Sequence, residues 1–234
     1  MRATPREVCS FKKESFKLSK IQKAVLVGTL LGDGGLRFRG KNCRLHIKHA
    51  KRQLPLVIYK RKIFSSITSM QTRLFNQFVG EKEYSFAEFV TLTHPVFTEY
   101  YSLFYRKAKK IVPINIGQLL TNPLSLAVWI MDDGSAEYAG LSIQTHSFNR
   151  EEVERLIEVI RLNFRIETTK RLNKRKWIIY FPKSSLPKLN LVLKGLILPE
   201  FRYKLIPYSI KHKPRRDCTP EPLNIKGYDT VRSA

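Results

Sequence analysis

The pattern of hydrophobic and polar positions predicts the same order of elements twice along this chain of 234 residues. Runs with apolar residues at helical spacing are followed by short segments in which apolar and polar residues alternate, as in half-buried strands. Each half reads helix, two strands, helix, two strands, helix, which predicts a mixed α/β (α+β) fold of two tandem αββαββα repeats. We expect a basic N-terminal arm at 1–18, a first half at 19–108, a linker at 109–121, a second half at 122–210 and a basic C-terminal tail at 211–234.

Capping residues mark where several of the predicted helices begin. A Ser or Asn side chain can accept from the free N–H groups of the first turn, and a Gln or Glu three residues later can return the bond. Such starts are found at Ser19 with Gln22, at Asn122 before Pro123, and at Asn149 with Glu152. The pattern also predicts a helix over 95–108 and a hairpin over 165–181 that turns on Asn173 and Lys174.

Two nine-residue stretches, Leu26–Gly34 and Leu126–Gly134, lie 100 residues apart and are closely alike. Each is an apolar helical run that ends in Asp-Gly. In the first helix Ala24, Gly28 and Gly32 recur every four residues, so one face of the helix is almost free of side chains. A second backbone can approach such a face closely. The repeat therefore predicts that the two helices pack side by side at a twofold centre.

The repeat also predicts that Asp33 and Asp133 come together at this centre. A carboxylate at the C-terminus of a helix meets the negative end of the helix dipole and is disfavoured there without a cation. A divalent metal would remove that cost, and Mg²⁺ suits carboxylate, carbonyl and water ligands. A lone Asp-Gly is more often a simple turn, but two at equivalent places in a duplication favour a metal site.

The predicted strands after the first stretch carry their polar residues on one face. Arg37 and Arg39 share a face, as do Arg44, His46 and Lys48, while the intervening residues are largely apolar. In the second half Ser142, Gln144 and His146 alternate with Leu141, Ile143 and Thr145 in the same way. A sheet face of cations and hydrogen-bonding groups suits phosphates and base edges.

The charge balance points to a polyanionic partner. The chain has 43 Lys and Arg against 19 Asp and Glu, a net charge of +24. Nucleic acid is the first candidate and an anionic membrane surface the rival, but no apolar run approaches the roughly 20 residues of a membrane span. The three scattered cysteines predict a reducing, intracellular compartment. The basic residues at 1–18 suit either a transit peptide or a DNA-contacting arm.

The two stretches resemble the motif of the LAGLIDADG homing endonucleases of the single-chain, two-motif type, which includes mitochondrial group I intron enzymes. The first copy matches well, whereas the second departs at Val128 and Trp129. The resemblance implies two saddle-shaped antiparallel sheets over double-stranded DNA, with the motif helices at the centre. It implies a monomer that breaks both strands of a long asymmetric target and leaves short 3′ overhangs. It also implies an intron-derived coding sequence, commonly in a mitochondrion or chloroplast.

The resemblance assigns roles to residues at the centre. Asp33 and Asp133 would hold two or three divalent ions, Mg²⁺ with Mn²⁺ able to substitute, assisted by the backbone carbonyls of Gly32 and Asp132. Lys110, with Lys109 as the alternative, and Lys204 match the family's catalytic lysines. Residues that position solvent would be His49, or less favourably His46, in the first half, and His146 or Gln144 in the second.

The expected DNA contacts form a longer set on the two sheets. They are Arg37, Arg39, Arg44, His46 and Lys48 in the first half, and Ser142, Lys170, Lys174, Arg175 and Lys176 in the second. Two rival functions remain on the same fold. One is an RNA-splicing maturase that acts on intron RNA, and the other is a DNA-binding protein without catalysis.

Overall fold

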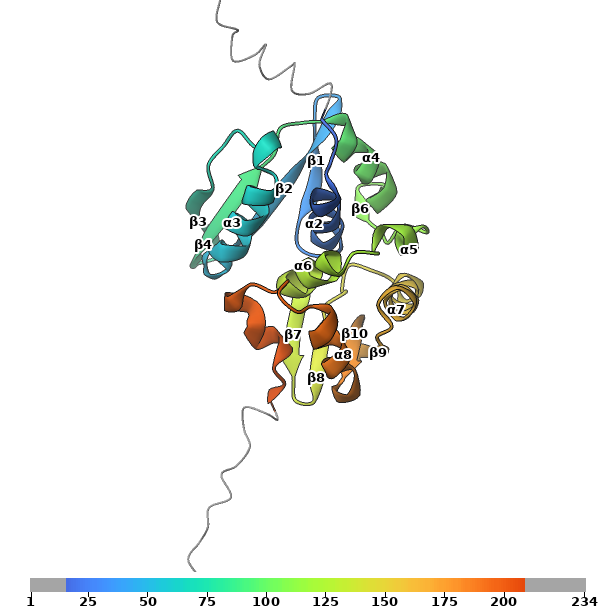
Figure 1. Ribbon diagram of the computed structural model, residues 1–234. Coiled ribbons are helices and arrows are strands. Elements are labelled where there is room, and N and C mark those ends of the chain that lie inside the picture. Colours follow the sequence, from blue (N-terminus) through green and yellow to red (C-terminus); the bar gives the residue numbers. More distant parts are fainter. Residues whose placement is uncertain (1–15, 209–234) are drawn as a thin grey trace, which may run out of the picture.

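A computed structural model describes residues 16–208 of the chain. Residues 1–15 of the predicted arm and the predicted tail at 211–234 lie outside the described residues. Two α/β halves lie end to end and meet at a pair of central helices (Figure 1). Each half contains one four-stranded antiparallel sheet, which confirms the predicted fold class.

The two sheets have the same topology. The first has the order β1-β2-β4-β3 and comprises β1 (Gly35–Arg39), β2 (Asn42–Ala50), β3 (Arg73–Val79) and β4 (Lys82–Val90). The second has the order β7-β8-β10-β9 and comprises β7 (Gly134–Glu137), β8 (Gly140–Ile143), β9 (Thr169–Asn173) and β10 (Lys176–Pro182). All neighbouring strands in both sheets run antiparallel, so the second sheet repeats the connections of the first.

Helices cover one face of each sheet and provide the central pair (Figure 1). The helices of the first half are α2 (Lys20–Leu31), α3 (Leu54–Ile63) and α4 (Pro95–Phe104). Those of the second half are α6 (Pro123–Asp133), α7 (Arg150–Phe164) and α8 (Leu186–Val192), and α5 (Ile116–Leu119) lies between the halves. Short 3₁₀ turns are η1 (Lys51–Gln53), η2 (Ser65–Ile67), η3 (Lys183–Ser185) and η4 (Pro199–Leu205). None of these helices is long and apolar enough to cross a membrane.

The predicted capping residues begin their helices as expected. Reciprocal bonds link Ser19 with Gln22 at the start of α2 and Asn149 with Glu152 at the start of α7. The Asn122 side chain accepts from the backbone N–H of Leu124 at the start of α6. These local signals fixed the starts of the helices because each one satisfies backbone N–H groups that the helix itself leaves free.

The two repeated stretches form α2 and α6, which pack against each other at the centre. A Cβ atom added at Gly28 would lie 2.3 Å from the carbonyl oxygen of Ser125, and one at Gly32 would lie 2.5 Å from Oδ2 of Asp132. Such distances are far inside van der Waals contact. The predicted close packing of the motif helices is therefore confirmed, and glycine is needed at both places.

The predicted helix over 95–108 ends early, at Phe104. The next residues form a small hairpin in which β5 (Tyr105–Arg106) pairs with β6 (Lys109–Lys110). Its turn is made by Lys107 and Ala108, both with positive φ angles of 48° and 59°. Positive φ is uncommon outside glycine, so the identities of these two residues did not predict a turn.

The second hairpin turns one residue later than predicted. Asn173 pairs with Lys176, so the turn consists of Lys174 and Arg175, with φ angles of 47° and 62°. Two consecutive positive φ angles match the twist of a two-residue hairpin. Both turn residues are exposed at the tip of the second sheet.

Candidate active site and nucleic-acid surface

Asp33 and Asp133 lie where the two motif helices end. Asp33 directly follows the C-cap of α2, and Asp133 is the last residue of α6. Both line one cavity of about 150 Å³. Its other lining residues come from the end of α2 and the loop after β8: Leu31, Gly32, Gln144, Thr145, His146, Ser147 and Phe148. The structure therefore brings together the two predicted carboxylates and the two predicted solvent-positioning residues of the second half.

The two carboxylates differ in their electrostatic surroundings. Burial, followed by repulsion from Asp33 and Asp132, raises the pKa of Asp133 to about 8. The Asp33 side chain is 47% exposed, and its interaction with the His49 ring lowers its pKa below the ordinary value. Asp133 is thus the group that most needs a neighbouring cation to become ionised.

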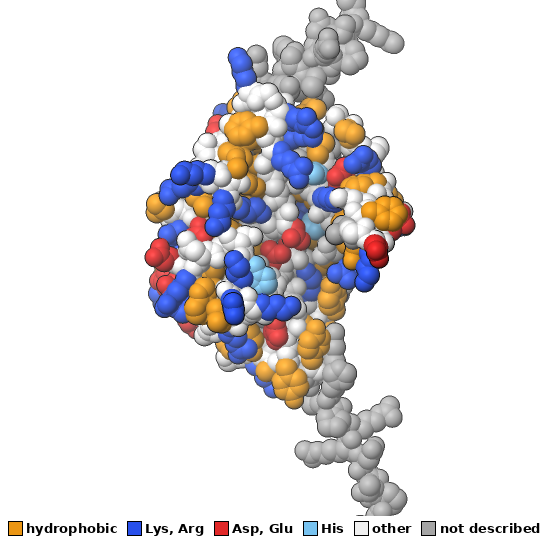
Figure 2. All heavy atoms as spheres, turned by 180° about the vertical axis from the view of Figure 1, so that it is seen from behind, with side chains coloured by type: hydrophobic (Ala, Val, Ile, Leu, Met, Phe, Trp, Pro, Cys, Tyr) orange, Lys and Arg blue, Asp and Glu red, His pale blue; other side chains and the backbone are white. Residues whose placement is uncertain are grey.

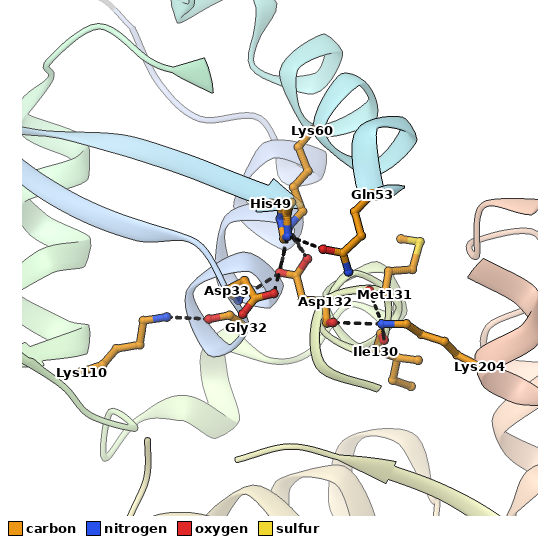
Figure 3. A network of polar contacts seen from close by, with 10 residues as sticks. All are labelled: Gly32, Asp33, His49, Gln53, Lys60, Lys110, Ile130, Met131, Asp132 and Lys204. Atoms are coloured by element: carbon orange, nitrogen blue, oxygen red, sulfur yellow. Dashed lines mark hydrogen bonds and ion pairs between the residues drawn. The ribbon is translucent and has the colours of Figure 1, made fainter. Parts of the chain in front are cut away.

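Lys110 and Lys204 approach the ends of the motif helices in equivalent ways (Figure 3). Lys110 Nζ donates to the carbonyl oxygen of Gly32 over 2.6 Å. Lys204 Nζ donates to the carbonyl oxygen of Asp132 over 2.9 Å and to that of Met131 over 2.6 Å. Cations here satisfy free helix carbonyls and oppose the negative end of the dipole. Burial lowers the pKa of both lysines.

The Gly32 and Asp132 carbonyls, predicted as metal ligands, are therefore hydrogen-bond acceptors for these lysines. A carbonyl oxygen has a second lone pair, so this contact does not occupy the whole acceptor. Lys109, the alternative to Lys110, is exposed on β6. The structure thus places Lys110 rather than Lys109 beside the carboxylates.

A buried ion pair at the centre was not predicted. Lys60 of α3 donates to both carboxylate oxygens of Asp132 over 2.6 and 2.7 Å, and neither side chain is exposed. The signal in the sequence was a lysine on the apolar side of a helix. Lys60 follows Val57 by three residues and precedes Phe64 by four, and both of these neighbours are fully buried. A lysine in such a stripe is almost never buried without a charged partner.

His49 lies between the two halves but is closed to solvent. Its side chain is 1% exposed, and Nδ1 lies 3.1 Å from Oε1 of Gln53 and 3.5 Å from Oδ2 of Asp33. Nε2 lies 3.6 Å from Oδ1 of Asp132. This burial differs from the exposure expected of a residue that positions solvent. His46 points to the opposite face of β2, where it pairs with Glu88.

The carboxylates and their surroundings fit a hard divalent cation. No three His, Cys, Asp or Glu side chains converge on one point within residues 16–208. Mg²⁺ usually takes only one or two carboxylates and completes its shell with water and substrate phosphates. Asp33 and Asp133 supply that number of carboxylates, and a cation would oppose the burial and repulsion that raise the pKa of Asp133.

The expected cationic face of the first sheet is present. Along β2 the burial alternates, with Cys43, Leu45 and Ile47 fully buried beneath the helices and Arg44, His46 and Lys48 on the other face. β1 adds Arg37 and Arg39, which are exposed and lie opposite Arg44 and Asn42 of β2 in the strand register. Figure 2 shows Lys and Arg side chains spread over this face of the molecule, with acidic side chains near its middle and at its left and right edges.

The same face is not purely cationic. Glu88 of β4 lies among the positive residues and pairs with His46 at 3.1 Å and with Arg73 at 2.6 Å. Lys48 lies over the rings of Phe75 and Phe86. The expected one-sign bias therefore holds for β1 and β2 but not for the neighbouring strand.

Two expected contacts of the second half are placed differently. Ser142 is fully buried, and its hydroxyl donates to Glu137 over 2.6 Å while it accepts from Gln144 over 3.0 Å. Lys170 lies opposite Ile179, a core residue, in the register of β9 and β10, so both side chains are on the same face of the sheet. The Lys170 ammonium donates a hydrogen bond to Glu154 of α7. Ser142 is therefore buried within its sheet, and Lys170 lies on the face of β9 that is turned toward α7.

The remaining cations of the second sheet lie as expected. Lys176 begins β10 and is exposed, beside the exposed turn residues Lys174 and Arg175. Arg171 takes the face expected for Lys170, because its guanidinium lies over the ring of Tyr180 and Tyr180 pairs with Ser142. Arg171 was not among the expected DNA contacts.

Two carboxylates at the junction of a tandem repeat, flanked by lysines and by cationic sheet faces, are features of an enzyme that acts on nucleic acid. A model described as the LAGLIDADG DNA endonuclease family matches residues 23–189. The chain belongs to this family and has both motifs in a single chain, as the sequence predicted.

Relatives and solved structures agree with this assignment. Cytochrome b mRNA maturase bI2 of Debaryomyces hansenii is 30% identical over 210 residues, covering 85% of this chain and 78% of that protein. Probable intron-encoded endonuclease 1 of Wickerhamomyces canadensis is 27% identical over 205 residues, covering 84% and 88%. The structure of the homing endonuclease I-WcaI bound to its DNA recognition sequence matches with a TM-score of 0.81 and 26% identity, covering 88% of this chain and 95% of that one.

Proposed function

We propose that this chain is a monomeric homing endonuclease that breaks both strands of a long, asymmetric DNA duplex by Mg²⁺-dependent phosphodiester hydrolysis, leaving short 3′ overhangs. The observation that carries the proposal is the shared cavity of Asp33 and Asp133 at the ends of the two motif helices. The similarity to a homing endonuclease solved on its DNA recognition sequence supports the DNA partner.

Asp33 and Asp133 would hold the cation. When bound there, the ion supplies charge for stabilising the phosphate and for activating a water nucleophile. Lys110 and Lys204 hold positive charge beside both carboxylates and fix the ends of α2 and α6. Gln144 and His146 line the cavity and would hold a water molecule there. Since the two halves face opposite strands, one centre can act on both.

The proposed DNA surface consists of the helix-free faces of the two sheets. Phosphate contacts position a duplex, and base contacts select its sequence. Arg37, Arg39 and Arg44 are the candidates for base recognition, because arginine can donate two parallel bonds to guanine. Because the residues differ between the two sheets, we expect an asymmetric target.

The decisive experiment is a selection of cleaved sites from a random duplex library. With Mg²⁺ we expect recovery of one long asymmetric site with cuts offset to give 3′ overhangs, and Mn²⁺ should substitute. Chelation and a variant with both Asp33→Asn and Asp133→Asn are the controls, since both should leave the library intact. If the wild-type protein leaves every duplex uncut in Mg²⁺, the proposal is wrong.

Intron RNA splicing is a second candidate function. It is favoured by the relative from Debaryomyces hansenii, which is named an mRNA maturase. An RNA surface need not use the catalytic carboxylates, so splicing should survive the double Asn substitution. Measuring excision of the host intron with wild-type and doubly substituted protein separates the two activities. The intron-encoded relative also supports a mobile intron, commonly in a mitochondrion or chloroplast, as the source of this chain.

A further inference from the structure

The two halves differ at the residue that precedes the catalytic aspartate. In the first motif this residue is Gly32, and in the second it is Asp132. A Cβ atom at Gly32 would lie 2.5 Å from Oδ2 of Asp132, so the space left by the first residue is filled by the side chain of the second. The second half thus places an extra carboxylate against the first half, and the first half cannot do the reverse.

Lys60 holds this carboxylate in one orientation. Its ammonium contacts both oxygens of Asp132 at 2.6 and 2.7 Å, and both side chains are fully buried. A pair buried this completely is costly to desolvate and is tolerated only with close geometry. The pair links α3 of one half to α6 of the other. Truncating either partner would leave the other charge buried and unpaired.

His49 connects the ion pair to Asp33 (Figure 3). One ring nitrogen, Nε2, faces Asp132 at 3.6 Å, and the other, Nδ1, faces Asp33 at 3.5 Å and Gln53 at 3.1 Å. The Asp33 backbone N–H also points to Oδ2 of Asp132, at 3.4 Å. The half-exposed Asp33 is therefore contacted on its buried side by His49 and Asp132, whose side chains are themselves buried.

Asp133 has different support. Within residues 16–208 its carboxylate has no hydrogen bond or ion pair to a side chain, and its strongest electrostatic neighbours are other carboxylates. The loop after β8 contributes Thr145 and His146 to the lining of the cavity, whereas His49 of the first half is buried beside Asp33 and does not line it. The two carboxylates that would hold the metal are thus held by unlike surroundings.

We propose that Lys60, Asp132 and His49 are positioning residues that hold Asp33 in place, so that the two DNA strands depend unequally on this network. The inference rests on the proposed function, because it concerns the same centre. A residue that orients a metal-binding carboxylate typically changes metal affinity or activity by roughly 10–100-fold when removed. An ion pair that merely stabilises the fold would instead change both strands alike.

The first test compares strand-specific cleavage by His49→Ala and wild-type protein on a duplex labelled at each end in turn. We expect one strand to be cut roughly 10–100-fold more slowly and the other to change far less. His49→Gln, which can still bond to a carboxylate, should restore part of the lost rate. The stability control is Ile47→Val, which removes one buried methyl group from the same face of β2 and should leave the ratio of the two rates unchanged.

The second test combines Asp132→Asn with Lys60→Met, which removes both charges of the ion pair and leaves neither one buried without a partner. The same strand should slow by a similar factor, and adding His49→Ala should slow it little further, since all three act through Asp33. Backbone hydrogen exchange of residues 31–36 without metal provides a readout that does not depend on catalysis. Exchange should be faster in His49→Ala and in the double variant than in wild type or Ile47→Val.

Equal slowing of both strands in His49→Ala, or unchanged exchange of residues 31–36 in the double variant, would overturn the inference. If the double variant does not fold, His49→Ala decides the question by itself. A wild-type protein that cuts no duplex would instead refute the proposed nuclease function. In that case the exchange measurements would still show whether the network holds Asp33.

Discussion

Replacing Asp133 by Asn should abolish cleavage and at the same time stabilise the metal-free protein. The reason is that burial, together with Asp33 and Asp132, raises the pKa of this carboxyl to about 8 from an ordinary value of 3.8. At neutral pH the unfolded chain ionises Asp133 freely, whereas the folded chain must either keep the proton or carry an unfavourable charge. Asn has nearly the same shape and removes this conflict.

The sign and size follow from proton linkage. The folded state holds the Asp133 proton more tightly than the unfolded state, so its stability falls as pH rises from about 4 to about 8. Each unit of pKa difference corresponds to about 1.4 kcal/mol, and about three units separate the ordinary pKa from pH 7. We expect Asp133→Asn to gain roughly 2–4 kcal/mol at pH 7, or on the order of 5–10 °C in Tm.

The assay is thermal unfolding with a chelator, at several pH values between 4 and 8. The gain should shrink toward pH 4, where the carboxyl is protonated in the folded state and about half protonated in the unfolded state. Asp33→Asn is the matched control. The interaction with His49 lowers the pKa of Asp33, so its charge stabilises the fold above its unfolded pKa, and that stability is lost as pH falls. The control should therefore be less stable than wild type at pH 7, although it too should not cut both strands.

Two results would contradict this reasoning. One is an Asp133→Asn protein that melts at or below the wild-type temperature at pH 7. The other is a gain in stability that stays constant from pH 4 to pH 8, which would show that the effect does not come from ionisation.

Three further predictions follow from the packing and the charges. Gly28→Ala should destabilise the fold by roughly 1–3 kcal/mol in chemical denaturation, since its methyl group would meet the Ser125 carbonyl; unchanged stability would mean the helices can separate freely. DNA binding should weaken steeply with salt, with a slope of about −0.9 per neutralised phosphate and on the order of ten contacts, so a flat salt titration would exclude the sheets as the DNA surface. Arg37→Ala or Arg44→Ala should relax the preference at one or two target positions by about 1–3 kcal/mol in a binding-site profile, whereas Arg161→Ala, on the outer helix α7, should not; unchanged profiles would place β1 and β2 away from the bases.

Features with short-range causes could be predicted from the sequence. The capped starts at Ser19, Asn122 and Asn149 depend on side chains within three residues of the backbone groups they satisfy. The alternation along β2 depends only on the period of a strand, so the sides of Arg44 and Ile47 were predicted correctly. The duplication also allowed a long-range prediction, because two similar stretches implied two similar helices in equivalent places.

Features with long-range causes could not. The burial of Ser142 and the contact of Lys170 with Glu154 depend on neighbouring elements, which no single strand contains. The role of Asp132 depends on Lys60, 72 residues earlier, and on the space that Gly32 leaves. The sequence shows a lysine on the apolar side of this helix but does not indicate which residue is its partner.

The charges at the centre explain why a cation belongs there. Three carboxylates, Asp33, Asp132 and Asp133, meet three ammonium groups of lysine, so the formal charges balance. The contacts are unevenly shared, however. Lys60 forms an ion pair with Asp132, whereas Lys110 and Lys204 donate hydrogen bonds to backbone carbonyls rather than to carboxylates.

Of these three carboxylates, only Asp132 is therefore in direct contact with a lysine ammonium group. Asp33 interacts with the buried His49 ring, and burial, followed by repulsion from the other two carboxylates, raises the pKa of Asp133. If Lys110 or Lys204 bonded directly to Asp133, the carboxylate would be satisfied and would bind a metal less tightly. By holding the helix ends instead, the two lysines keep positive charge near the cavity and leave both carboxylates free to take a divalent ion together with a DNA phosphate.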